Sequence, residues 1–244
     1  LDKLYASAVS LSDGDQQVIL VSCDLGYIME ETVAQIRNAV QEATGVQPEN
    51  INISATHTHS GPYMGYDYRS YYRGEAQDAE DKTVRDRIAA GIAQAAIQAF
   101  ERRKPASVGY GSASVGRCCY NRRFIMSDGR SRMQPGFDNP DSLMVEGPVD
   151  NQFQVVWFED DDHQPLAIMA NLASHPVNFY GCAWLSADFP GEMRAVVNSA
   201  IGKPVPVLFL QGACGNVTPI NYGEGDRWEN NFDRYRRCGR ILAG

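Results

Sequence analysis

The chain has 244 residues, of which 43% are hydrophobic, so it is long enough to bury one substantial core and we predict one domain over residues 1–244. Its formal net charge of −8 argues against a nucleic-acid partner, because phosphate recognition needs a clustered basic surface. No apolar stretch approaches the roughly 20 residues that cross a bilayer, and the six cysteines lack a CxxC pair, which predicts buried thiols instead of a disulfide scaffold or a zinc knot.

The first third of the chain alternates strand and helix patterns. Residues 4–11 and 18–22 are apolar runs around a Ser-Asp-Gly-Asp turn, which predicts a β-hairpin. Apolar positions at helical spacing predict a helix over Glu30–Thr44, and Gly45 is its expected C-terminal stop. We expect a short buried strand at Ile51–Ala55 and, after it, an exposed tyrosine-rich loop over 63–77.

The rest of the chain continues in the same way. Residues 81–103 predict a long amphipathic helix, and a strand follows over 107–111. Segment 121–149 is rich in Gly, Pro, Asn and Asp, so we expect a long loop that is functional or structured by packing. The remaining expected elements are a hairpin over 152–158 and 166–172, a helix over 190–201, a buried strand over 205–210 and a helix over 227–243.

This order of elements predicts an α/β fold, a layered mixed sheet with flanking helices. Two short basic groups, at 102–104 and 234–237, are interpreted as solvated faces of their helices.

Polar side chains that can carry chemistry follow four separate strands. They are Asp24, the pair His57 and His59, His175, and the loop 215–219. Ligands gather beyond the strand ends of open α/β sheets, so we expect these groups to meet at one edge. The fourth histidine, His163, lies in an acidic turn and is interpreted as a solvated surface residue.

His57 and His59 are separated by one residue, so both imidazoles project to the same side of an extended segment. That geometry suits two metal ligands, or one ligand and one polar neighbour. Two hydrogen-bonded loop histidines are the structural alternative. Because three of only four histidines follow buried strands, a functional site is the better interpretation.

The other polar candidates have structural alternatives. Asp24 fits a metal ligand, a turn residue or, as we prefer, an acceptor that fixes an imidazole tautomer. Asp188 fits catalysis or a helix cap. The glycines of 212–215 suit either close approach to a substrate oxygen or a tight turn. Cys214 is interpreted as a packed thiol, since no base for a nucleophile is evident.

Four motifs, taken in chain order, resemble those of the neutral/alkaline non-lysosomal ceramidase family, and the similarity is greatest to its bacterial branch. They are Ala55-Thr56-His57-Thr58-His59-Ser60-Gly61-Pro62, Tyr120-Asn121-Arg122-Arg123, Asn171-Leu172-Ala173-Ser174-His175-Pro176 and Gly215-Asn216-Val217-Thr218-Pro219. The resemblance runs through nearly the whole chain, and its first motif is the most specific.

By this resemblance His57 and His175 would be Zn²⁺ ligands, with His59 and Arg122 beside the metal to contact substrate or a developing oxyanion. The family's other two ligands, a Glu and a Tyr, come from further downstream, which implies a catalytic unit incomplete at its C-terminus. Thr218 stands where the family has a serine with a nucleophilic or substrate-positioning role. The neighbouring Asn216 and Ile220 replace a family Asp and Asn, which weakens the case for ceramide itself as substrate.

The resemblance therefore implies a zinc-dependent amidohydrolase that cleaves an N-acyl amide of a small molecule or lipid, and a secreted or periplasmic location. Two alternatives stay open. One is a metal-dependent hydrolase of a non-lipid amide or ester, and the other is a non-catalytic binding module on the same fold.

Overall fold

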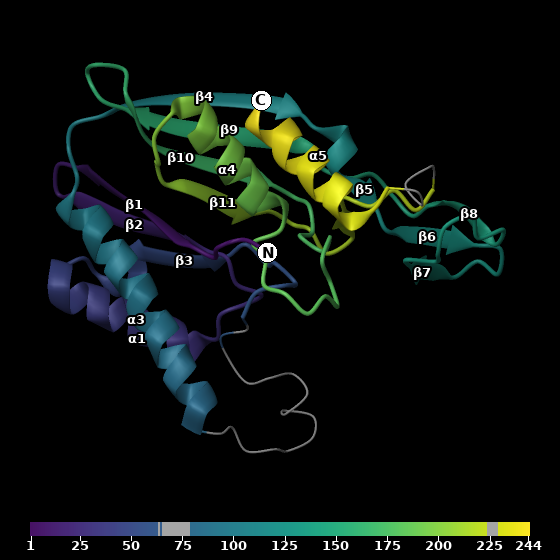
Figure 1. The fold of residues 1–244 in the computed structure, drawn as a ribbon, viewed down its shortest axis with the longest axis horizontal. Helices are drawn as coiled ribbons and strands as arrows, with labels where there is room; N and C mark the ends of the chain where they lie inside the picture. The colour runs from purple at the N-terminus through teal and green to yellow at the C-terminus, as the bar shows by residue number, and fades with distance from the viewer. Residues whose placement is uncertain (63, 65–78, 224–228) are drawn as a thin grey trace.

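A computed structural model of the chain describes residues 1–62, 64, 79–223 and 229–244. Two β-sheets pack face to face, and a pair of helices covers the outer face of each (Figure 1). The expected α/β class with a layered mixed sheet is confirmed, but the layer is built from two mixed sheets. The expected loop over 63–77 lies outside the described residues, apart from Met64. None of the described helices combines the length and apolar character needed to cross a bilayer.

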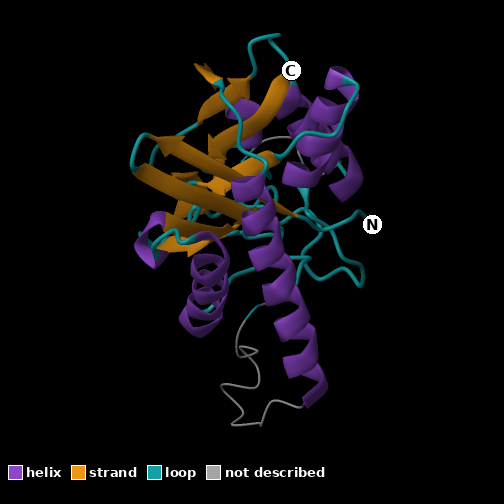
Figure 2. Cartoon of the chain, turned by 90° about the vertical axis from the view of Figure 1, so that its left-hand side faces the viewer, coloured by secondary structure: helices purple, strands orange, loops and turns teal. Residues whose placement is uncertain are grey.

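The first sheet has the order β1-β2-β3. The hairpin predicted near the N-terminus is confirmed as β1 (Ala6–Asp13) antiparallel to β2 (Gln16–Cys23), and β3 (Ile51–Ala55) runs parallel to β2. Helix α1 (Glu30–Thr44), which ends at a left-handed Gly45, leads through the short η1 (Pro48–Asn50) into β3. The long α3 (Ala79–Glu101) packs on α1 and β1; it runs obliquely beside α1 in Figure 1 and extends below the sheets in Figure 2.

The second sheet has the order β11-β10-β9-β4. The second predicted hairpin is confirmed as β9 (Gln152–Glu159) and β10 (Pro165–Leu172), and β4 (Ser107–Ser114) extends it at the edge. At the other edge of this sheet, β11 (Val207–Gln211) runs parallel to β10. Helices α4 (Phe189–Ile201) and α5 (Asn231–Ala243) cover this sheet and pack on each other.

Three apolar clusters hold the layers together. One lies between α1, α3 and the first sheet, and includes Ile19, Ile36 and Ile51. A second lies between the other sheet and α4 and α5. The third, between the two sheets, joins Val9 to Leu208. Burial of these faces follows the strand and helix periodicities, because each element has one apolar side to remove from water.

Segment 121–149, expected as a long loop that is functional or structured by packing, contains strands that were not expected. Its β6 (Arg123–Met126) pairs with both β7 (Ser131–Met133) and β8 (Ser142–Val145) in a small antiparallel sheet. The preceding η2 (Gly116–Cys118) leads into β5 (Tyr120–Asn121), which pairs with β12 (Val217–Thr218). The sequence did not indicate these strands because they are two to four residues long, too short to show a period of two.

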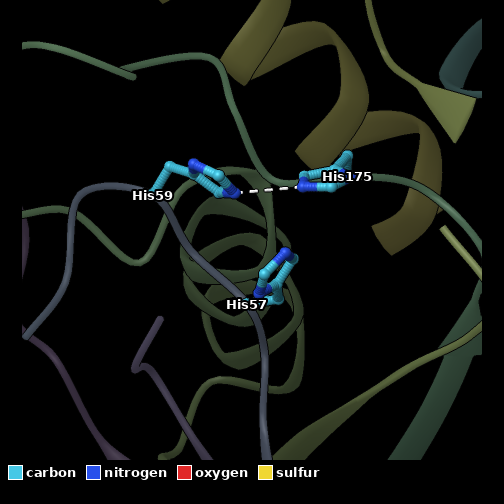
Figure 3. A group of neighbouring side chains, drawn as sticks. All are labelled: His57, His59 and His175. Carbon is cyan, nitrogen blue, oxygen red and sulfur yellow. Dashed lines mark hydrogen bonds between the residues drawn. The ribbon is translucent and has the colours of Figure 1, made fainter. Parts of the chain in front are cut away.

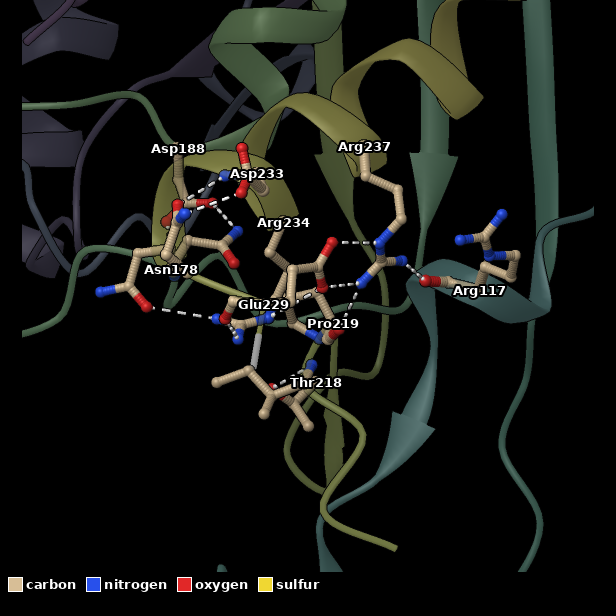
Figure 4. Close-up of polar contacts among 12 residues, drawn as sticks. Arg117, Asn178, Asp188, Thr218, Pro219, Glu229, Asp233, Arg234 and Arg237 are labelled. Carbon is tan, nitrogen blue, oxygen red and sulfur yellow. Dashed lines mark hydrogen bonds and ion pairs between the residues drawn. The ribbon is translucent and has the colours of Figure 1, made fainter. Parts of the chain in front are cut away.

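The basic group on α5 is a solvated face only in part, which corrects that interpretation: Arg236 is exposed, but its two neighbouring arginines are not. Arg234 is only 3% exposed. Its neighbour one turn on, Arg237, pairs with Glu229 through contacts of 2.8 Å. Arg237 also donates to the Pro219 carbonyl, and Arg234 donates to the Glu229 carbonyl at 2.8 Å (Figure 4).

Candidate metal centre

The segment after β3 carries His57 and His59 and is held by the strand beside it. The Thr56 N–H donates to the Cys23 carbonyl and the His57 N–H to the Leu25 carbonyl, which continues the β2–β3 pairing past the strand end. His57 has a φ of 67°, in the left-handed region that non-glycine residues rarely adopt. This turn brings its Nδ1 to 2.8 Å from the Gly26 carbonyl oxygen.

His175 follows β10 and is fixed by a loop that follows β11. Four consecutive carbonyls of this loop, from Cys214 to Val217, hold two of the predicted site residues. The backbone N–H of His175 donates to the Val217 carbonyl at 3.1 Å, and its Nδ1 lies 3.1 Å from the Cys214 carbonyl oxygen. The backbone N–H of Arg122 donates to the Asn216 carbonyl at 2.8 Å. The guanidinium of Arg122 donates twice to the Gly215 carbonyl, at 2.8 and 3.1 Å.

The structure brings His57, His59 and His175 into one cluster (Figure 3). Each ring offers one nitrogen, and these nitrogens all lie within 4.8 Å of one another. The ring centroids are separated by 4.6 to 4.9 Å, and the His59 and His175 Nε2 atoms are 3.0 Å apart. In the part of the chain that the structure describes, this is the only group of three or more potential ligands with metal-binding geometry.

The hydrogen bonds of the cluster fit a divalent metal. A carbonyl accepts and cannot donate, so the Nδ1 atoms of His57 and His175 carry the protons. In its neutral form each of these two rings has its lone pair on Nε2, which is the usual arrangement of a metal-binding histidine. Because the Nε2 of His175 carries the lone pair, its 3.0 Å contact with the Nε2 of His59 is a hydrogen bond that His59 donates.

Electrostatics also keep the rings of His59 and His175 neutral. Burial lowers the pKa of His175 to about 4, with the nearby Arg122 charge adding to the effect. Burial likewise lowers the pKa of His59 to about 4, followed by the neighbouring His57 and Arg122 charges. Neutral imidazoles are the form that binds Zn²⁺, so the residues present fit the metal that the sequence suggested.

Asp24 does not orient an imidazole, which corrects our preferred interpretation. Its buried carboxylate pairs with Arg194 of α4 at 2.6 Å and accepts the Tyr5 N–H at 2.8 Å. Burial raises the pKa of Asp24, and the Arg194 guanidinium opposes that rise. The tautomer of His57 is fixed by the Gly26 carbonyl instead.

Asp188 is the N-cap of α4, as one of its two interpretations predicted. Its side chain accepts the Phe189 N–H at 2.6 Å. It also accepts the backbone and side-chain N–H groups of Asn178, at 2.7 and 2.6 Å (Figure 4). Because Asn178 is three residues beyond His175, this cap fixes the segment that leaves the cluster.

The remaining candidates take structural positions. His163 is exposed and pairs with Glu159, as expected. The six cysteines are free, and all but Cys182 are buried. Cys214 contacts His175 through its carbonyl, and burial raises the pKa of its thiol.

A side chain at Gly212 would meet the backbone of Ala173 at 3.0 Å, so this glycine permits close packing of two strands.

Thr218 lies on β12, directly after the carbonyl that holds the His175 backbone, and is fully buried. The carbonyl of the next residue, Pro219, accepts from the Arg237 guanidinium at 3.4 Å. The same guanidinium also donates to the Arg117 carbonyl (Figure 4). Sequence reasoning missed this support from α5. A cluster of arginines beside an acidic residue is the only signal that marks it.

A large groove lined by described residues lies away from the histidine cluster. It has a volume of about 1330 Å³ and runs along β1, between α3 and α4. Its lining includes none of the three histidines, so its apolar walls say nothing about the substrate of the cluster.

The chain is similar to several known proteins. Residues 1–219 match the family described as "Neutral/alkaline non-lysosomal ceramidase, N-terminal". Neutral ceramidase of Pseudomonas aeruginosa is 25% identical over 232 residues, which cover 92% of this chain and 33% of that protein. Neutral ceramidase A of Dictyostelium discoideum is 28% identical over 227 residues, which cover 87% of this chain and 30% of that protein.

Two solved structures share the fold. One, described as "Ceramidase complexed with C2", has a TM-score of 0.75 at 23% identity, over 98% of this chain and 37% of that chain. The other, the neutral ceramidase from Pseudomonas aeruginosa, has a TM-score of 0.73 at 24% identity, over 94% of this chain and 36% of that chain. The chain therefore spans about a third of the length of these relatives.

Proposed function

Because the chain belongs to the neutral/alkaline non-lysosomal ceramidase family, we propose that it supplies part of the active site of a zinc-dependent hydrolase that cleaves an N-acyl amide bond. The relatives are named as ceramidases, and an N-acyl sphingoid lipid is the corresponding substrate class. The observation that carries the proposal is the pair of Nδ1-to-carbonyl hydrogen bonds, which direct two Nε2 lone pairs into one cluster.

His57 and His175 would hold the Zn²⁺. When bound, the metal supplies a Lewis acid that polarises a carbonyl and lowers the pKa of bound water to about 7. One ring nitrogen of His59 lies within 4.8 Å of the ligand nitrogens of His57 and His175. His59 would therefore serve as a polar neighbour of the metal or as a third ligand, and the sequence left both roles open.

The protein's own side chains then have separate tasks. The guanidinium of Arg122 is half-buried beside the cluster and fixed by Gly215, so it is oriented before substrate arrives. Together with His59 it would stabilise the negative charge that develops on the substrate carbonyl oxygen. The buried Thr218 would position the substrate, either with its hydroxyl or through the backbone that it shares with the His175 contact.

The proposal is tested on the complete protein by metal analysis and by turnover. We expect bound zinc, lost in the His57→Ala variant, and hydrolysis of an N-acyl sphingosine that disappears with the zinc. Full activity of the metal-free protein would refute the mechanism. Turnover of only a short N-acyl amine would indicate a non-lipid amide hydrolase, and absence of both zinc and turnover would indicate a binding module.

A further inference from the structure

Two buried thiols meet where α5 packs on the short helix η2. Cys118 is the last residue of η2 and Cys238 lies in the middle of α5. Both are completely buried, and both belong to the apolar cluster between α5 and the second sheet. The Cys238 thiol donates a hydrogen bond to the Cys118 sulfur, so the two side chains point at each other across the interface.

The residues that precede the two cysteines are joined as well. Arg237 donates through its guanidinium to the Arg117 carbonyl, although the two residues are 120 positions apart in the chain (Figure 4). The same guanidinium is held by the Glu229 carboxylate through two contacts of 2.8 Å. The approach of the two sulfurs therefore follows from how α5 docks on η2.

The two thiols differ in how readily they ionise. The hydrogen bond from Cys238 lowers the pKa of Cys118 against the effect of burial, and the charges of Arg237 and Arg117 lower it further. The same hydrogen bond, with burial, raises the pKa of Cys238. One partner is thus the better thiolate and the other holds the proton, which suits thiol–disulfide exchange because the thiolate is the attacking form.

The adjacent Cys119 does not share this arrangement. Its Sγ lies 3.7 Å from the Ala173 carbonyl oxygen, to which its thiol donates. Burial raises the pKa of Cys119 to about 12, so it stays protonated. Cys119 is therefore a matched internal control, equally deep in the fold but directed at a different partner.

We propose that Cys118 and Cys238 form a reversible disulfide that fastens α5 to η2. The oxidant is a small disulfide such as oxidised glutathione. The Cys118 thiolate attacks one of its sulfurs, and one glutathione leaves and takes up the proton that Cys118 released. Cys238 then attacks the Cys118 sulfur, and its proton goes to the second glutathione as that leaves. Two cysteine thiols are oxidised, and one disulfide is reduced to two thiols.

The cross-link joins two segments that support the candidate metal centre. The Cys118 carbonyl accepts from the hydroxyl of Ser174 at 2.5 Å, one residue before His175. On the other side, Arg237 donates to the Pro219 carbonyl at 3.4 Å. Because both sulfurs are buried, exchange requires that α5 is away from η2, so the disulfide closes as α5 docks and then keeps it docked. A bond that closes so long a loop removes much entropy from the opened chain.

The bond itself is tested by mass spectrometry of the complete protein. Wild type is incubated with oxidised glutathione in roughly hundredfold excess over reduced glutathione until the thiol count is constant. Remaining thiols are then blocked under denaturing conditions before digestion. We expect a peptide pair linked through Cys118 and Cys238 that dithiothreitol separates, with Cys119 blocked. The link should persist in Cys119→Ala and be absent from Cys238→Ala. Recovery of Cys118 and Cys238 as blocked thiols, or a link between Cys118 and Cys119, would overturn the proposal.

Hydrogen exchange tests the fastening of α5 separately from the chemistry. Backbone amides of α5 should exchange roughly tenfold more slowly in oxidised than in reduced wild type, because the cross-link opposes opening of this helix. Amides of α1, which covers the other sheet, should exchange equally in both forms. In Cys238→Ala, which keeps a good helix former in α5, oxidation should change neither helix. Unchanged exchange of α5 in a protein that carries the linked peptides would overturn the fastening.

Discussion

Replacing Asp188 with asparagine tests how a buried carboxyl group supports the segment after His175. Asp188 is completely buried, and its two oxygens accept three N–H groups, from Phe189 and twice from Asn178. An asparagine keeps one acceptor oxygen but turns an NH₂ group toward a backbone N–H. One buried donor is then left without a partner, which costs about 1–3 kcal/mol.

The protonation of Asp188 gives this cost a dependence on pH. Burial raises the pKa of Asp188 from 3.8 to about 6, against the hydrogen bonds from Asn178 and Phe189. A raised folded-state pKa means that the contribution of the group to stability is complete below its unfolded pKa and is lost as pH rises through the folded value. A rise from 3.8 to about 6 corresponds to about 3 kcal/mol, roughly half of which is lost between pH 5 and pH 7.5.

The assay is urea unfolding of wild type and Asp188→Asn from pH 5 to pH 7.5, with chelator present so that metal binding does not contribute. The variant lacks the titrating group, so its destabilisation relative to wild type should shrink by about 1.5 kcal/mol as pH rises over this range. Asp161→Asn, at an exposed turn, is the control and should show no such trend. A destabilisation that grows with pH would refute the reasoning, because the three N–H donors would then outweigh burial.

Three further predictions concern the cluster and its support. His57→Ala should abolish the increase in Tm that zinc gives the wild type, which at a hundredfold excess over Kd corresponds to about 2.7 kcal/mol, and calorimetry with and without zinc measures this. Arg122→Lys loses the two-pronged contact with Gly215, so kcat should fall roughly 10²-fold with zinc content unchanged; an unaltered kcat would exclude a role in oxyanion stabilisation. Gly212→Ala forces a side chain to within 3.0 Å of the Ala173 backbone and should cost about 1–3 kcal/mol in urea unfolding, so a neutral result would contradict the packing argument.

Much of the fold was accessible from local patterns. Both hairpins and the helix over Glu30–Thr44 with its Gly45 stop were predicted, and so was the long helix, expected over 81–103 and found at Ala79–Glu101. Their periodicities and caps are properties of contiguous residues. The short strands within 121–149 were not predicted. Their pairing comes from neighbours that fold back on them, and composition alone does not show which segments will meet.

The polar contacts were likewise predictable where they are local in sequence and not where they join distant segments. The helix-capping interpretation of Asp188 was available from sequence, since an acidic residue before Phe-Pro-Gly is a local signal. The partner of Asp24 was not available, because Arg194 lies 170 residues away on a helix that approaches only after the two sheets have packed. Two arginines of the expected solvated face on α5 likewise have partners outside the helix turn that carries them: Arg237 donates to the Pro219 carbonyl, and the buried Arg234 donates to the Glu229 carbonyl.

The sequence by itself determined that His57, His59 and His175 follow strands of one α/β fold, because strand ends and histidines are both visible in a linear pattern. Only the tertiary structure decided that the three rings share one cluster and which nitrogens face it. The groups that orient His57, His175 and Arg122 are backbone carbonyls of Gly26 and of the loop from Cys214 to Val217. Every residue has a carbonyl, so no choice of side chain marks those that will bind a histidine until the chain has folded.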